Sequence, residues 1–131
     1  MDTNTSTHTT EDLAARFFAA IEAGDIATLG SIYSPDAVIW HNTDNSTQDV
    51  SANLALLVRL TGVVTNWRYT EVRRTILDDG FVQQHVLRGD APGGELNVPA
   101  MLRVWVVDSR ITRLDEYVDG ETVFKVLRRP R

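Results

Sequence analysis

The sequence predicts an α+β fold in which a curved, mixed or antiparallel sheet wraps around three N-terminal helices and forms a cone with an apolar pocket. Apolar residues in the first half of the chain recur at helical spacing, and the second half consists of long β-rich runs separated by hairpin signals. A chain of 131 residues can bury one substantial core but hardly two. We therefore expect a single domain over residues 10–127, preceded by a disordered tail over residues 1–9.

The three helices are predicted from apolar residues spaced three or four apart. The first begins at Thr10 and ends at Gly24, because glycine readily takes the left-handed conformation that closes a helix. Asp25 can cap a second, short helix, which the turn at residues 34–36 stops. A third helix is expected over residues 49–61.

The first strand is expected over residues 37 to 41 or 42, followed by a polar loop at 43–47. Beyond the third helix, β-branched and aromatic residues dominate, and short segments rich in Asp, Gly and Ser mark hairpin turns. Strands as long as these must twist or bend, and sheet curvature leaves a cavity at the wide end. The remaining strands are expected over residues 66–77, 81–88, 95–107 and 110–118.

Composition excludes several classes of function. The formal net charge is −5, which argues against nucleic acid as a partner, and the absence of cysteine removes disulfide and thiolate chemistry. Lys125 is the single lysine, which argues against a Schiff-base mechanism. The first ten residues are polar and no later segment resembles a membrane span, so we expect a cytoplasmic protein without a membrane partner.

Glu116 is the first candidate for chemistry. Alternation along the last strand places it on one face with the apolar residues Leu114 and Val118. A carboxyl group in such surroundings loses solvation, which raises its pKa and suits it to move a proton near neutral pH. The alternative is that this face is exposed to solvent and that Glu116 pairs with an arginine such as Arg103.

His85 is the second candidate, because it shares a strand face with the mostly apolar residues Phe81, Gln83 and Leu87. If His85 faced Glu116 across a cavity, the two would form an acid and base pair. A lone histidine on an apolar strand face is, however, more often a hydrogen-bonded core residue, and that interpretation stays open.

The first strand offers two alternatives. His41 and Asn42 are consecutive, so both can point inward only where a strand is bulged or ends. With Trp40 and Asn42 inward, an aromatic wall and an amide would orient a substrate oxygen or a water. With His41 inward, the site would hold a base instead, and Trp40 can also be a core residue.

His41, His85 and Glu116 together form a two-histidine, one-carboxylate set that would suit iron or zinc. They come from separate strands without close ligand spacing, so no metal and no cofactor is predicted. Further candidates for the cavity wall, most of which are better interpreted as core residues, are Phe17, Leu57, Trp67, Met101 and Trp105.

Three phrases carry a resemblance to a known family: AAIEAGD at residues 19–25, YSPDAV at 33–38 and RITRLDEYVD at 110–119. They resemble the nuclear transport factor 2-like superfamily, particularly its SnoaL-like branch, between Thr10 and Gly120. The resemblance implies the cone fold and a homodimer formed through the open sheet faces. It does not imply one activity, because this fold hosts isomerases, hydrolases, cyclases, dehydratases and non-catalytic modules.

Two members of the superfamily give sharper comparisons. Relative to ketosteroid isomerase, the tyrosine position falls on Phe17, the base position on His41 and the oxyanion aspartate near Met101, so that oxyanion hole is missing and that route is rejected. Relative to limonene-epoxide hydrolase, Trp40-His41-Asn42 resembles its Tyr-x-Asn motif and Glu116 stands where the water-activating aspartate would be. Its arginine and second aspartate fall on His85 and Leu87, so epoxide hydrolysis is not indicated.

The sequence therefore predicts a cofactor-independent enzyme, an isomerase, cyclase or hydrolase/hydratase, that performs acid/base chemistry on a small apolar oxygenated substrate. The alternative is a non-catalytic module of the same fold that binds a small hydrophobic ligand or associates with itself. The predicted catalytic residues are Glu116, His85, His41 and Asn42. The predicted substrate-binding residues are Trp40, Phe17, Leu57, Met101, Leu87 and Leu114.

Overall fold

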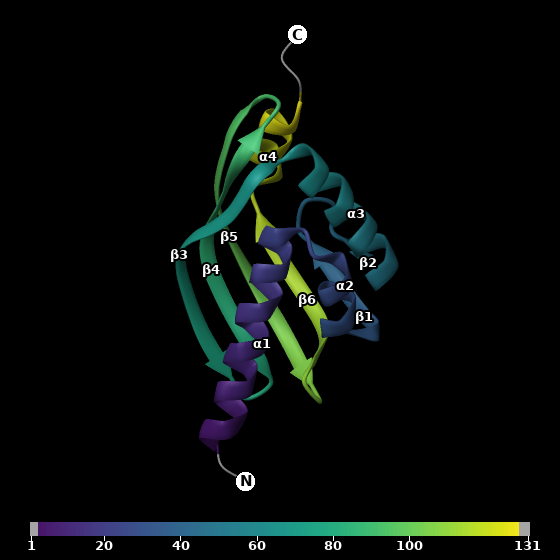
Figure 1. Ribbon diagram of the computed structural model, residues 1–131, viewed down its shortest axis with the longest axis vertical. Helices are drawn as coiled ribbons and strands as arrows, with labels where there is room; N and C mark the ends of the chain where they lie inside the picture. Colours follow the sequence, from purple (N-terminus) through teal and green to yellow (C-terminus); the bar gives the residue numbers. More distant parts are fainter. Residues whose placement is uncertain (1–2, 129–131) are drawn as a thin grey trace.

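The computed structural model describes residues 3–128, which form four helices and six strands (Figure 1). The helices are α1 (Thr3–Ala23), α2 (Ile26–Ile32), α3 (Val50–Val63) and α4 (Gly120–Leu127). The strands are β1 (Tyr33–His41), β2 (Ser46–Gln48), β3 (Thr65–Leu77), β4 (Gly80–Ala91), β5 (Gly94–Val107) and β6 (Arg110–Val118). No helix within the described residues is both long enough and apolar enough to cross a membrane.

The six strands form one curved, unclosed sheet in the order β2-β1-β6-β5-β4-β3. The pair β1–β6 is parallel and the other neighbouring pairs are antiparallel, so the sheet is mixed. Figure 1 shows α1, α2 and α3 against one side of this sheet, with α4 at the end opposite the start of α1. The predicted α+β class and the curved sheet around three helices are confirmed.

The core lies between α1 and the concave face of the sheet. The apolar side of α1 is almost completely buried, and its Phe17 and Phe18 meet aromatic rings of the strands edge-on. The ring of Phe17 lies 5.8 Å from that of Tyr33, and the ring of Phe18 lies 6.2 Å from that of Phe81. A second, smaller apolar cluster lies toward α4 and comprises Val64, Leu87, Leu96 and Val98.

Two aspartates cap helices, and the cap at Asp25 was predicted from the sequence. The side chain of Asp25 accepts a hydrogen bond from the backbone N–H of Thr28 at 3.1 Å, which caps α2. Asp49 accepts from the N–H of Ala52 at 2.8 Å and caps α3. Gly24 has a φ of 66° and closes α1 as expected.

The structure differs from the prediction at four places. Helix α1 begins at Thr3 and not at Thr10, because its polar first turns carry no apolar period to reveal them. Strand β1 begins at Tyr33. The expected turn at 34–36 lies within this strand, where its pairing with β6 is irregular and Pro35 has no N–H to donate. Strand β2 and helix α4 were not predicted. Residues 1, 2 and 129–131 lie outside the described residues.

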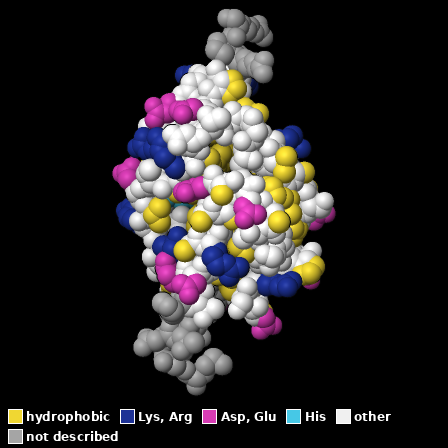
Figure 2. Space-filling model, in the orientation of Figure 1, with side chains coloured by type: hydrophobic (Ala, Val, Ile, Leu, Met, Phe, Trp, Pro, Cys, Tyr) yellow, Lys and Arg dark blue, Asp and Glu magenta, His cyan; other side chains and the backbone are white. Residues whose placement is uncertain are grey.

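Helix α3 covers one edge of the concave face and is only partly buried. Its leucines Leu54, Leu56, Leu57 and Leu60 are half-buried, whereas Val58 and Val63 are 53% and 45% exposed. Hydrophobic side chains accordingly reach the surface on the side of the molecule where α3 lies (Figure 2). This half-buried position gives α3 an inner side that lines the cavity described next.

Candidate functional site

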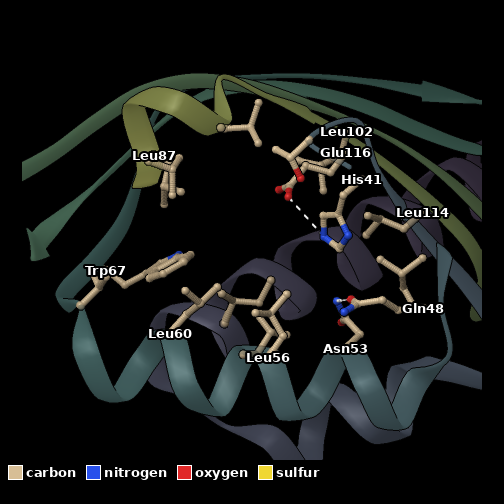
Figure 3. Close-up of a pocket in the computed structure, with 18 of the residues that line it drawn as sticks. His41, Gln48, Asn53, Leu56, Leu60, Trp67, Leu87, Leu102, Leu114 and Glu116 are labelled. Atoms are coloured by element: carbon tan, nitrogen blue, oxygen red, sulfur yellow. Dashed lines mark hydrogen bonds and ion pairs between the residues drawn. The ribbon is translucent and has the colours of Figure 1, made fainter. Parts of the chain in front are cut away.

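A cavity of about 310 Å³ lies between the concave face of the sheet, α3 and α4. This volume is at the lower end of the range of small-molecule sites. Most of the lining is aliphatic or aromatic, and α4 closes one end with Val123, Phe124 and Leu127. Figure 3 shows the polar side chains gathered at one end and Trp67, Leu60 and Leu87 at the other. The cavity therefore has a polar end and an apolar end.

His41 and Glu116 form the centre of the polar end. They are register partners on the parallel strands β1 and β6, so their side chains leave the sheet on the same face. The Nε2 atom of His41 lies 3.5 Å from Oε1 of Glu116. The two side chains keep 17% and 29% of their accessible surface, so both are largely withdrawn from water and still reachable from the cavity.

The electrostatics of this pair suit proton transfer. Burial raises the pKa of Glu116, and the neighbouring His41 lowers it by less, so the net direction is upward. The carboxylate is therefore a stronger base than one in water. The imidazole of His41, 3.5 Å from Glu116, supplies the second group to which a proton can pass.

A second polar group lies next to the pair. The hydroxyl of Tyr33 donates to Oδ1 of Asn53 at 3.1 Å, and Nδ2 of Asn53 donates to Oε1 of Gln48 at 3.4 Å. Burial, followed by the charge of Glu116, raises the pKa of Tyr33, so its hydroxyl keeps its proton. All three side chains line the cavity.

The sequence reasoning missed this group. Asn53 precedes Leu57 by one helical turn and therefore stands on the apolar face of α3, where a buried amide is unusual. An amide at this position was the feature of the sequence from which Asn53 could have been identified as a cavity residue. Gln48 and Tyr33 gave no such signal, because Gln48 lies between the loop expected at 43–47 and the helix expected from residue 49, and Tyr33 was assigned to the helix that precedes the strand.

The comparisons with known proteins agree with this architecture. The model of the SnoaL-like domain matches residues 14–114. The chain belongs to the SnoaL-like domain family. This membership confirms the resemblance inferred from the sequence.

Solved structures with a similar fold include a SnoaL-like polyketide cyclase, so named provisionally, from Jannaschia sp. CCS1, with a TM-score of 0.83, 14% identity, and coverage of 100% of this chain and 99% of the other. A similarly named protein from Shewanella denitrificans OS-217 has a TM-score of 0.74 and 20% identity, covering 90% of this chain and 96% of its own. A hypothetical protein with a ketosteroid isomerase-like fold from Catenulispora acidiphila, in complex with trimethylamine, has a TM-score of 0.76 and 16% identity, covering 90% and 93%. Identities this low establish the fold alone. No curated protein sequence matches this chain.

Within this SnoaL-like domain, six of the predicted site residues line the cavity. They are Glu116, His41, Phe17, Leu57, Leu87 and Leu114. Between the two alternatives for the first strand, the structure places His41 inward. The four remaining residues, His85, Asn42, Trp40 and Met101, do not line this cavity.

The expected pairing of His85 with Glu116 is not the arrangement in the structure. His85 is 4% exposed and packs against the rings of Phe18 and Tyr69, with centroids 5.7 Å and 4.6 Å away. Its Nδ1 lies 2.8 Å from Nε2 of Gln83, whose Oε1 accepts from Arg74 at 2.8 Å. His85 is thus a hydrogen-bonded core residue, the alternative that the sequence left open.

Asn42 has a structural contact at the end of the β1–β6 pair. Its Nδ2 donates to the carbonyl oxygen of Val118 at 3.1 Å, and its Oδ1 accepts from the N–H of Val118 at 3.0 Å. The side chain therefore continues the ladder beyond His41, which ends strand β1. Asn42 holds the two strands together beside the cavity and does not point into it.

Trp40 and Met101 lie on the opposite side of the sheet because of strand alternation. Trp40 donates from Nε1 to Oδ1 of Asn45 at 3.0 Å, and its ring lies 5.2 Å from that of Tyr117. Met101 is the register partner of Tyr117, and its neighbour Leu102 is the one that lines the cavity. Among the side chains of residues 9–128, no three His, Cys, Asp or Glu residues are grouped closely enough to hold a metal ion.

Proposed function

We propose that this SnoaL-like domain is a cofactor-independent enzyme that moves a proton on a small, largely apolar, oxygenated substrate. The observation that carries the proposal is the His41–Glu116 pair, whose atoms lie 3.5 Å apart on the wall of an otherwise mostly apolar cavity. An acid and a base positioned side by side, away from bulk water, are the minimum requirement for such chemistry.

In the proposed reaction, the carboxylate of Glu116 removes a proton from the substrate. His41 then returns a proton to a different atom of the substrate or to a leaving group. Isomerisation and cyclisation share this first step, whereas in addition of water Glu116 would take the proton from the water molecule. The aliphatic walls exclude water, which strengthens each electrostatic contact at the polar end.

The mostly apolar lining also favours a second candidate, a binding module that takes up a small hydrophobic ligand without changing it. In this case His41 and Glu116 would satisfy each other and the cavity alone would carry the function. The two candidates differ in one measurable respect, because an isomerase or cyclase of this kind exchanges substrate protons with solvent and a binding module does not.

The decisive experiment measures the exchange of ligand C–H protons for deuterium in D₂O, by mass spectrometry, over a panel of small ketones, enones and lactones. The wild-type protein should accelerate exchange for at least one compound, and Glu116→Gln should reduce that rate by roughly 10²- to 10⁴-fold. Glu95→Gln is the matched control, because Glu95 is 60% exposed and lies outside the cavity. Binding without any exchange would favour the module.

The same variant has a predicted stability signature. Because burial raises the pKa of Glu116, the folded state favours the protonated form, and the wild type loses stability as pH rises above the unfolded value of 4.5. Glu116→Gln does not titrate, so its melting temperature should equal or exceed that of the wild type, and increasingly so from pH 4.5 upward. A variant that melts clearly lower than the wild type at pH 8 would show instead that Glu116 is half of a stabilising ion pair.

A further inference from the structure

Trp67 carries a polar group at the otherwise apolar end of the cavity. We infer that its indole N–H donates a hydrogen bond to a second oxygen of the ligand, at the end remote from the His41–Glu116 pair. The ligand is then a small neutral molecule with two oxygen functions. One of them lies at the pair, and the other is an ether, carbonyl or hydroxyl oxygen at the opposite end. The inference rests on the proposed function of the cavity and adds a feature to its substrate.

The first support is an unsatisfied atom. Among the side chains of residues 9–128, Nε1 of Trp67 is the one buried nitrogen or oxygen without a hydrogen-bond partner. A buried tryptophan N–H normally has an acceptor, and the lack of one costs free energy that an apolar side chain at the same place would not incur. Packing alone therefore does not explain a tryptophan at this position, whereas an acceptor supplied by a ligand does.

The neighbouring protein groups do not supply this acceptor. Trp67 packs against both apolar clusters, and Val64 and Leu87 of the smaller cluster, which also line the cavity, have only hydrocarbon side chains. Burial raises the pKa of Tyr69, and the indole of Trp67 lowers it by less, so these two side chains are neighbours. They do not meet in hydrogen-bonding geometry, however, and the N–H keeps no partner.

The second support is the backbone that presents Trp67. Where β3 pairs with β4, Asn66 and Trp67 together oppose the single residue Gly89, which is a β-bulge. Asn66 has a φ of 54°, a left-handed conformation that few residues other than glycine adopt. The bulge shifts the alternation by one residue, so that Val64 before it and Trp67 after it both line the cavity. The local backbone is thus arranged to aim Trp67 at the cavity.

The lining defines what kind of acceptor fits. The described lining contains neither arginine nor lysine, so a carboxylate or phosphate would have no cationic partner there. A neutral oxygen accepts the N–H without that cost. The cavity volume of about 310 Å³ corresponds to roughly ten non-hydrogen atoms at about 30 Å³ each, which is the size of one ring with two short substituents.

The two polar positions lie across the cavity from each other. Figure 3 shows Trp67 with Leu60 and Leu87 at one end, and His41 with Glu116 at the other. A ligand whose reacting atom lies at the pair would therefore direct its other end at the indole. A ligand that lacks the second oxygen leaves the N–H unsatisfied, and the site distinguishes the two ligands for this reason.

The test uses two probes of the same shape: 1,4-dimethoxybenzene, which has an oxygen at each end, and 1,4-diethylbenzene, which has none. Both are symmetric, so the direction of binding does not matter, and neither requires the proton-transfer step. The chain has three tryptophans, so a ¹H–¹⁵N spectrum contains three indole N–H resonances. The resonance of Trp67, identified by its loss in Trp67→Phe, should lie further downfield with the diether than with the hydrocarbon, because only the diether offers an acceptor.

Affinities give the second measurement. The dissociation constant of the hydrocarbon divided by that of the diether should be about five-fold higher in the wild type than in Trp67→Phe, which keeps an aromatic wall without the N–H. Trp105→Phe is the matched control and should keep the wild-type ratio, because Trp105 lies outside the cavity and packs on Arg103. If Trp67→Phe does not fold, Trp40→Phe and Trp105→Phe identify the Trp67 resonance by elimination, and the wild-type shift still decides.

Three outcomes would overturn the inference: a Trp67 resonance that is the same with both probes, a ratio of dissociation constants that Trp67→Phe leaves unchanged, or no binding of either probe. The proposed function fails separately. If substrate protons exchange and the Trp67 resonance does not respond to the oxygen, acid/base catalysis stands and this contact falls. If the resonance responds to the oxygen but no compound exchanges protons, the contact stands and the catalytic proposal falls.

Discussion

Acid should destabilise this protein through a single core histidine. Burial, and to a smaller extent the nearby guanidinium of Arg74, lowers the pKa of His85 from 6.5 to about 4. The folded state therefore keeps His85 neutral over a range in which the unfolded chain already binds a proton. The stabilisation is complete above pH 6.5 and is lost as the pH falls from there toward 4.

The magnitude follows from the two pKa values. One pKa unit corresponds to about 1.4 kcal/mol, and the linkage integral gives a loss of about 2 kcal/mol at pH 5 and about 3 kcal/mol at pH 4. For a chain of this length, the loss at pH 5 corresponds to a fall of about 8 °C in melting temperature. Residual solvation of the ring makes these values upper limits.

The measurement is the free energy of unfolding in urea from pH 7.5 to pH 4, for the wild type and for His85→Gln. The variant cannot titrate and should show no loss from this source, so the wild type should lose about 3 kcal/mol relative to it across the range. Other titrating groups cancel in this difference. His41→Gln is the matched control and should retain the acid-dependent loss, because His85 is still present. Parallel pH profiles for wild type and His85→Gln would refute the assignment of His85 as a neutral core residue.

Two further predictions concern the outer side of the sheet and the β1–β6 pair. We predict a homodimer through the convex sheet face, where Tyr117 is 46% exposed beside Trp40 and Met101. Light scattering should give a mass of twice 14.6 kDa for the wild type and 14.6 kDa for Tyr117→Lys. A monomer mass for the wild type would contradict this prediction. Asn42→Ala should cost about 0.5–1.5 kcal/mol in unfolding free energy, because its two solvent-exposed hydrogen bonds to the backbone of Val118 are lost, and should slow proton exchange only slightly. A large loss of exchange with an unchanged melting temperature would return Asn42 to the catalytic group.

Local chemistry was readable from the sequence wherever neighbours in the chain decide the structure. Asp25 and Asp49 cap helices because a carboxylate next to free N–H groups is a local arrangement. The face of β6 that carries Glu116 followed from strict alternation, and Leu114, Glu116 and Val118 all line the cavity. Helix α4 was missed because a short apolar segment after a strand has the same pattern whether it continues the strand or turns into a helix.

The composition of the site depended on contacts that no local pattern contains. His41 meets Glu116 because β1 and β6 pair in parallel in one particular register, and a shift by one residue would have turned Trp40 or Asn42 inward. His85 and Glu116 lie on the same face of the sheet, but Phe18 and Tyr69 pack around His85 and withdraw it from the cavity. The sequence by itself determined the fold class, the cap of α2 and the face of β6 that carries Glu116, because these depend on neighbours in the chain and on periods of two and 3.6 residues. Only the tertiary structure decided that His41, and not His85, lies beside Glu116, because strand register and helix packing are set by the whole core at once.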